Sequence, residues 1–149
     1  MARAELDAAI ASWQQGTARL LELVRAVPPE AWERPSGNEG WTNIELLAHL
    51  ATGYGTRIGT LRAVIDTAPA PVGDVDAENA AGVEQWRRAP APSIIEEMVR
   101  ARRQVLTLLH ALRNEHLEAT VALRGGPRLG DALAHLSEHD LEHAAELRP

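Results

Sequence analysis

Apolar residues recur at steps of three and four along most of this 149-residue chain, a spacing that places them on one face of a helix. Residues 3–27 show it most clearly, with one stripe made of Leu6, Ile10, Trp13, Thr17, Leu20, Val24 and Val27. Pro28 and Pro29 follow, and proline cannot continue a helix. The sequence therefore predicts a first helix over 3–27.

Three further segments carry the same pattern. Thr42 and Glu45 have the spacing of a capping box, so we expect a second helix from Thr42 to about Asp66. A similar box, S-I-I-E, predicts that a third helix begins at Ser93. The last helix is expected at about 129–147.

The connections between these helices differ in length. The longest is 67–92, and its middle, from Asp76 to Arg87, is expected to hold a short helix. Thr and Val alternate closely around Leu117–Leu123, which favours an extended segment there. Four amphipathic helices with one long crossing connection between the second and third predict an all-α four-helix bundle, formed as a single domain over 1–149.

Charge and composition narrow the function classes. The net charge of −6 argues against a nucleic-acid or anionic-membrane partner, because phosphates are held by clustered positive charge. No apolar run approaches the length that crosses a bilayer, about 20 residues. The acidic start, MARAELDAA, is unlike a signal peptide, so we expect a cytoplasmic protein. There is no cysteine, which excludes disulfides, thiolate ligands and a cysteine nucleophile.

Three of the six histidines stand four residues apart, at His135, His139 and His143. Neighbours at this spacing lie on one helical face and can share an ion, whereas the outer two are too far apart to do so. On a helical wheel His139 and His143 face the bundle, and His135 lies near its edge. We therefore favour His139 and His143 as a metal-binding pair, with two buried structural histidines as an equal alternative.

A third ligand would come from His49, His110 or His116. His49 shares its helical face with small residues, Gly53, Thr56 and Thr60, so it lies either beside a cleft or at a close packing contact. The wheel alone does not choose between these readings.

Four stretches together carry a resemblance to a known family: GWTNIELLAHL, DVDAENAAGVEQW, SIIEEMVRARRQVLTLLHAL and LGDALAHLSEHDLEHAAEL. They resemble the DinB-like superfamily, which includes the metal-binding N-terminal domain of mycothiol-dependent maleylpyruvate isomerase. The resemblance covers nearly the whole chain in the same order. It implies a metal held by His49, His139 and His143, with His135 matching a family histidine that is usually not a ligand.

Three neutral imidazoles suit zinc or nickel better than magnesium or calcium. The resemblance also implies an enzyme that uses a low-molecular-weight thiol such as mycothiol or bacillithiol, and our first hypothesis is a thiol S-transferase acting on a small-molecule electrophile. A metal-assisted hydrolase and a non-enzymatic metal- or ligand-binding stress-response protein are the alternatives. Family members often pair, so a homodimer is expected, with one of the four Trp left outside the bundle.

The sequence also suggests roles for three charged residues, Asp140, Glu45 and Arg57. Asp140 falls on the apolar face of the last helix, where it is expected to accept structural hydrogen bonds or to support the metal site. Glu45 is expected to cap its helix rather than act as a catalytic base. Arg57 is expected to be a solvated surface residue, with attraction of an acidic cofactor or substrate as the alternative.

Overall fold

The computed structural model describes residues 2–70, 73 and 75–149, and within them the regular structure is helical, with two isolated β-bridges and no strand. The α-helices are α1 (Ala2–Arg25), α2 (Asn43–Thr52), α3 (Gly55–Asp66), α4 (Val75–Trp86), α5 (Ala91–Ala111), α6 (Leu129–Leu133) and α7 (Glu138–Ala144). Two short 3₁₀ turns add Pro29–Ala31 and Asn114–Glu118. No described helix has both the length and the apolar character needed to span a membrane.

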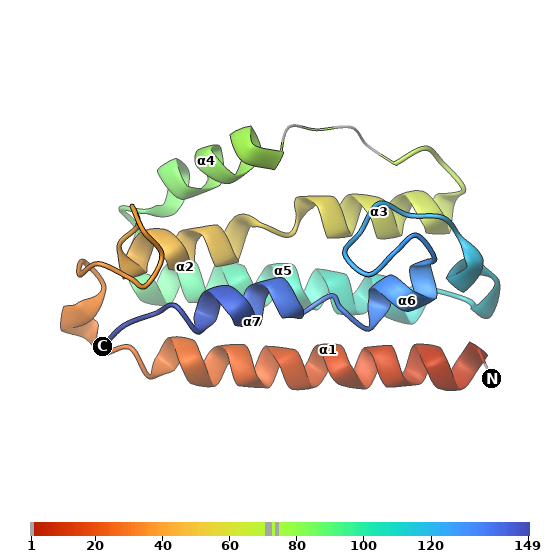
Figure 1. Ribbon diagram of the computed structural model, residues 1–149, viewed down its shortest axis with the longest axis horizontal. Coiled ribbons are helices and arrows are strands. Elements are labelled where there is room, and N and C mark those ends of the chain that lie inside the picture. The colour runs from red at the N-terminus through yellow and green to blue at the C-terminus, as the bar shows by residue number, and fades with distance from the viewer. Residues whose placement is uncertain (1, 71–72, 74) are drawn as a thin grey trace.

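Four rods form the bundle, as Figure 1 shows: α1, α2 continued by α3, α5, and α6 continued by α7. The α5 rod packs against α1 on one side and against α2 and α3 on the other, while α7 packs between α1 and α2. The connection after α3 crosses the outside of the bundle, and its helix α4 lies on α2. The predicted four-helix bundle with a long crossing connection is confirmed.

The core is filled mainly by aliphatic side chains, as a chain without Phe requires. The largest fully buried ones include Leu6, Leu20, Leu46, Leu47, Leu50, Leu61, Ile94, Met98, Leu109 and Leu117. Trp13 is buried, and the other three Trp are partly buried. All four Trp thus pack on the core to some degree, and the expected homodimer stays a prediction.

The predicted capping box at the start of α2 is present. The hydroxyl of Thr42 accepts a hydrogen bond from the backbone N–H of Glu45 at 3.3 Å, and the Glu45 carboxylate accepts one from the Thr42 N–H at 3.2 Å. The box predicted at Ser93 is wrong, because α5 already begins at Ala91 after Pro90. The Ser93 N–H bonds to the Pro90 carbonyl, so Ser93 lies inside the first turn. The extended segment predicted at Leu117–Leu123 is wrong at its start, which belongs to the 3₁₀ turn Asn114–Glu118.

Two helices predicted as continuous are interrupted. The second helix breaks at Gly53 and Tyr54, after Thr52 turns its hydroxyl back onto the Ala48 carbonyl, a contact that tends to bend helices. The last helix breaks at 134–137, where hydrogen bonds close three-residue turns instead of four-residue turns. Each break leaves a backbone carbonyl that an arginine side chain uses.

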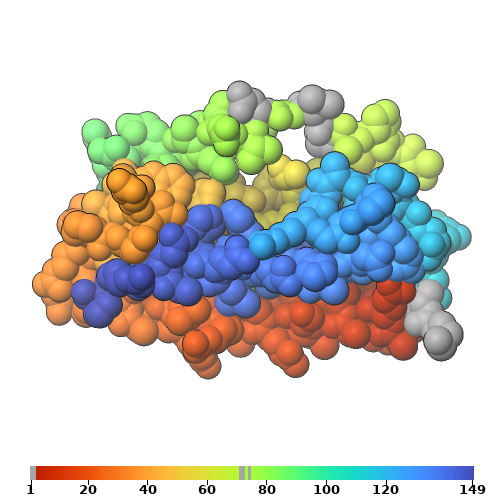
Figure 2. Space-filling model, viewed as in Figure 1, coloured from red at the N-terminus to blue at the C-terminus, as the bar shows by residue number. Residues whose placement is uncertain are grey.

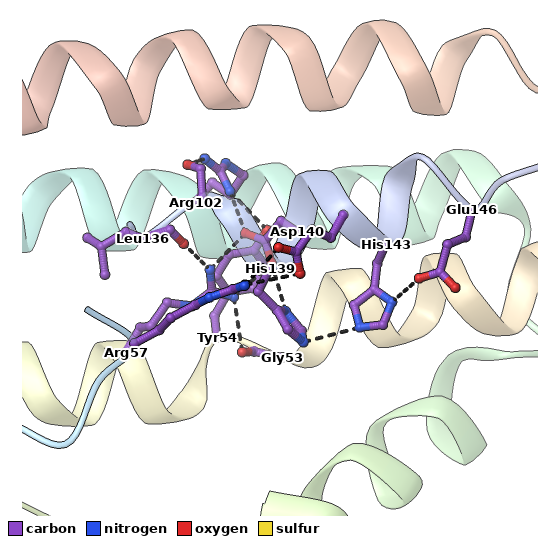
Figure 3. A network of polar contacts seen from close by, with 12 residues as sticks. Gly53, Tyr54, Arg57, Arg102, Leu136, His139, Asp140, His143 and Glu146 are labelled. Carbon is purple, nitrogen blue, oxygen red and sulfur yellow. Dashed lines mark hydrogen bonds and ion pairs between the residues drawn. The ribbon is translucent and has the colours of Figure 1, made fainter. Parts of the chain in front are cut away.

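That arginine is Arg57, which is buried rather than solvated as the sequence predicted. One of its terminal nitrogens donates to the Leu136 carbonyl at 2.7 Å, and the other to the Gly53 carbonyl at 3.2 Å. Both also donate to the carboxylate of Asp140, at 2.7 and 3.0 Å (Figure 3). The prediction that Arg57 lies on the surface was wrong. The helix breaks leave buried backbone carbonyls that can accept its hydrogen bonds, and the apolar periodicity of the sequence does not show these breaks.

Asp140 is also bonded by a second buried arginine, Arg102, at 2.8 Å. The Arg102 guanidinium lies 3.6 Å from the ring centroid of Trp13, and that of Arg57 lies 4.3 Å from the ring centroid of Tyr54. Aromatic faces stabilise a desolvated guanidinium in this way. Asp140, Arg57 and Arg102 therefore form one ionic cluster in the middle of the bundle, and Asp140 is the structural acceptor that the sequence predicted.

Replacing Asp140 by Ala leaves two buried guanidiniums without their shared carboxylate. We expect the free energy of unfolding to fall by about 3–5 kcal/mol, the usual cost of breaking a buried ion pair. Urea unfolding followed by circular dichroism measures it. The control is Glu22→Ala, which removes an exposed pair with Arg19 and should cost about 1 kcal/mol or less. Equal losses in the two variants would contradict a structural role for the cluster.

Candidate metal centre

Three imidazoles converge between α2 and α7. His49 comes from α2, while His139 and His143 come from successive turns of α7. One candidate ligand nitrogen from each ring lies within 4.8 Å of the other two. The ring centroids of His139 and His143 are 4.5 Å apart, and that of His49 lies 5.5 and 4.8 Å from them. The structure thus brings together the three residues that the family resemblance implied.

Carboxylates orient the two rings of α7. The Nδ1 atom of His143 lies 2.6 Å from the carboxylate of Glu146, and the Nδ1 atom of His139 lies 3.6 Å from that of Asp140. The two Nε2 atoms lie 3.1 Å apart, as Figure 3 shows. A carboxylate beside one ring nitrogen fixes the ring and leaves the other nitrogen to bind a metal. The Nε2 atoms of His139 and His143 are therefore both available to bind one metal ion between them.

His49 is the buried member of the cluster, with 4% of its surface exposed. Its ring lies against Trp41, with 4.9 Å between the ring centroids. Burial is the main cause that lowers its pKa to about 4. The neighbouring His143, His139 and Arg57 act in the same direction, and Asp140 opposes them. His49 is therefore neutral near pH 7, the form in which imidazole binds metals.

The Nδ1 atom of His49 has no hydrogen-bond partner in the described part of the chain, although it is buried. Such an unsatisfied polar atom costs about 1–3 kcal/mol, so it requires an explanation. A buried atom of this kind within a cluster of three imidazoles fits a divalent metal ion. The donor set, three neutral nitrogens, is one that zinc and nickel accept.

The other three histidines lie outside the cluster. His135 pairs with Glu138, 2.6 Å from its Nδ1 atom, and His110 is exposed. His116 is buried, and its Nδ1 accepts a hydrogen bond from the Arg113 N–H at 2.9 Å. Each therefore has a local role or contacts solvent, and none completes a second cluster among the described residues.

The remaining predictions about this region have mixed outcomes. Glu45 is a helix cap as expected. The sequence left two alternatives for His49, a cleft or a close packing contact. The structure places a cavity of about 310 Å³ beside Gly53, Thr56 and His139, and His49 is not in its lining. Thr60 is buried and is not part of that lining.

Sequence reasoning missed two groups that contact the cluster. Glu146 stands three residues after His143, a spacing that places side chains together on a helix and would have revealed it. Trp41 lies in the turn just before α2, and its ring contacts the ring of His49. No local pattern indicates that contact.

Comparisons with known proteins identify the family and the fold. The sequence pattern of the DinB superfamily matches residues 3–147. Two similar solved structures are those of a mycothiol-dependent maleylpyruvate isomerase, with 17% identity and a TM-score of 0.78, and of a histidine-to-alanine mutant of such an enzyme, with 14% identity and a TM-score of 0.81. Each match covers 95% of this chain and 60% of the other, so this chain spans less than two thirds of those proteins. No curated protein matches the sequence.

The Glu146 contact predicts a definite tautomer for His143. A carboxylate only accepts hydrogen bonds, so the proton of neutral His143 should be on Nδ1, with the lone pair on Nε2. Long-range proton–nitrogen NMR on metal-free protein distinguishes the two forms. Glu146→Ala should let His143 populate both tautomers, whereas Glu142→Ala should change nothing at His143. An Nε2 proton on His143 in the unchanged protein would contradict the assignment.

Proposed function

The chain belongs to the DinB superfamily, and from this premise we propose that it is a divalent-metal-dependent thiol S-transferase. It would join a low-molecular-weight thiol, such as mycothiol or bacillithiol, to a small electrophile. The observation that carries the proposal is the cluster of His49, His139 and His143, with its buried unsatisfied nitrogen, next to a cavity. Since the chain has no cysteine, the thiol must come from outside it.

The three histidines would hold zinc or nickel. Three protein ligands are typical of catalytic zinc sites, which keep one position for water or substrate. When bound, a divalent ion lowers the pKa of a coordinating thiol, so that the thiol ionises at neutral pH. The transfer then forms one sulphur–carbon bond. In an addition the thiol proton ends on the product, whereas in a substitution the bond from carbon to the leaving group breaks and the leaving group and the proton go to solvent.

The residues of the chain supply orientation and shielding. Glu146 and Asp140 hold the α7 rings, and Trp41 covers the His49 ring. Arg57 and Arg102 keep Asp140 ionised: burial by itself raises the pKa of Asp140, but the His139 ring and the two arginines outweigh it and lower the pKa to about 2. A permanent carboxylate is therefore available to the Nδ1 side of His139.

The environment of Glu45 does not favour the hydrolase alternative. A metal-assisted hydrolase needs a nearby carboxylate base, and Glu45 was the candidate. Its carboxylate instead accepts hydrogen bonds from the Thr42 backbone and hydroxyl, and it lies 3.7 Å from Arg87. These contacts occupy the group in capping and ion pairing, which supports the transferase over the hydrolase.

The metal assignment predicts which histidines matter. His49→Ala, His139→Ala and His143→Ala should each lower zinc or nickel affinity about 100-fold or more, because each removes a direct ligand. His135→Ala is the matched control, since His135 belongs to the same chain segment but pairs with Glu138 outside the cluster. Equilibrium dialysis with metal analysis gives the affinities. Metal loss in His135→Ala with retention in His143→Ala would overturn the assignment.

The transferase also predicts that turnover depends on thiol. Metal-loaded protein should accelerate the conjugation of mycothiol or bacillithiol to a slow electrophile such as monochlorobimane, above the rate of thiol and electrophile without protein, with the conjugate measured by fluorescence. His139→Ala should abolish this reaction, because it removes a ligand at the cavity. Turnover of an ester without thiol would favour the hydrolase instead. Silence in both assays with metal bound would favour a binding protein.

A further inference from the structure

The cavity beside the histidine cluster is built from four separate parts of the fold. It has a volume of about 310 Å³, within the range of small-molecule sites, and His139 is in its wall. Its other walls come from α3, the start of α4 and the segment before α6. Figure 2 shows the surface hollowed at this place, between the green α4, the yellow α3 and the light-blue segment.

Most of the lining that is not charged is apolar. Val75, Ala122, Leu123 and Leu136 form apolar walls, and Thr56 and Asn79 add uncharged polar groups. Val75 is the exposed large hydrophobic residue of the described chain, with 51% of its surface accessible. A concave site with mostly apolar walls and a few polar groups is typical of small-molecule sites.

The two arginines in the wall are already paired. Arg57 is committed to Asp140 and to two backbone carbonyls. Arg124 makes a two-pronged contact with Glu142, at 3.0 and 2.8 Å, and lies 3.6 Å from Glu138. An anionic ligand would have to displace Glu142 from Arg124 while two carboxylates repel it.

We infer that this cavity binds a neutral, largely apolar small molecule and discriminates against an anionic one of the same shape. Its place beside His139 makes that molecule the electrophile of the transferase, an assignment that rests on the proposed function. The binding preference itself rests only on the walls and their charges. It therefore holds whether or not the reaction proposed above takes place.

Two probes of equal shape test the preference. Methyl 2-naphthyl sulfone is neutral and naphthalene-2-sulfonate is anionic, and neither is a strong metal ligand. Calorimetric titration of the full chain, free of metal and of thiol, should give a dissociation constant at least about tenfold lower for the sulfone. The NMR signals of the His135 ring, which lines the cavity, should shift on binding, and those of exposed His110 should not.

Variants around the cavity test whether its apolar wall and its paired arginine cause the preference for the neutral probe. Val75→Asp removes an apolar wall and adds a charge at the first turn of α4, where an acid is tolerated, and it should weaken sulfone binding about tenfold. Ala81→Asp places the same charge on the exposed part of α4 outside the cavity and should leave binding unchanged. Glu142→Gln releases Arg124 and should strengthen sulfonate binding several-fold without affecting the sulfone.

Three results would overturn the inference: equal or tighter binding of the sulfonate, equal effects of the two Asp variants, or no His135 shift. Failure of the transferase is seen separately. Sulfone binding without any thiol-dependent turnover would support the cavity preference and contradict the transferase. Thiol-dependent turnover without sulfone binding would support the transferase and contradict the cavity preference.

Discussion

The ion pair between Arg57 and Asp140 is the interaction on which the geometry of the histidine cluster depends. Arg57 bonds the carbonyl of Gly53, at the end of α2, and the carbonyl of Leu136, just before α7. These are the two helices that carry the cluster. Both helices are interrupted next to the histidine cluster. The buried guanidinium of Arg57 bonds the backbone at both interruptions and so holds α2 and α7 in one relative position. A buried pair gives little net stability, so its role is better understood as fixing one arrangement.

The second arginine makes this arrangement possible. Asp140 accepts from Arg57 and Arg102 together, so the interior holds more positive than negative charge at this point. Trp13 and Tyr54 lie against the two guanidiniums and provide π faces that take the place of water. Trp13 also donates its indole N–H to the Arg102 carbonyl at 3.1 Å, which ties α1 into the same cluster. The four rods of the bundle thus meet at one charged centre.

Much of the fold follows from local sequence, but the breaks do not. Apolar periodicity and the Thr42 box locate the rods, because these signals depend on residues within one or two turns. The carbonyl of Leu136, beside the second break, binds Arg57, which lies 79 residues away in sequence, so no local pattern shows this contact. The same limit applies to the site: spacing identified His139 and His143, whereas His49 was chosen only through the family resemblance. Arg57 was misplaced for the same reason, since its partner is 83 residues away.

Burial changes steadily across the cluster and gives the site a direction. The side chain of His139 is 48% exposed, that of His143 is 20% exposed, and His49 is almost fully buried. Trp41 closes the His49 side, whereas His139 faces the cavity. In the proposed function, a substrate would therefore approach past His139, between α3 and the start of α4. At that entrance Arg57 is paired with Asp140 and Arg124 with Glu142, which agrees with the inferred preference for a neutral ligand.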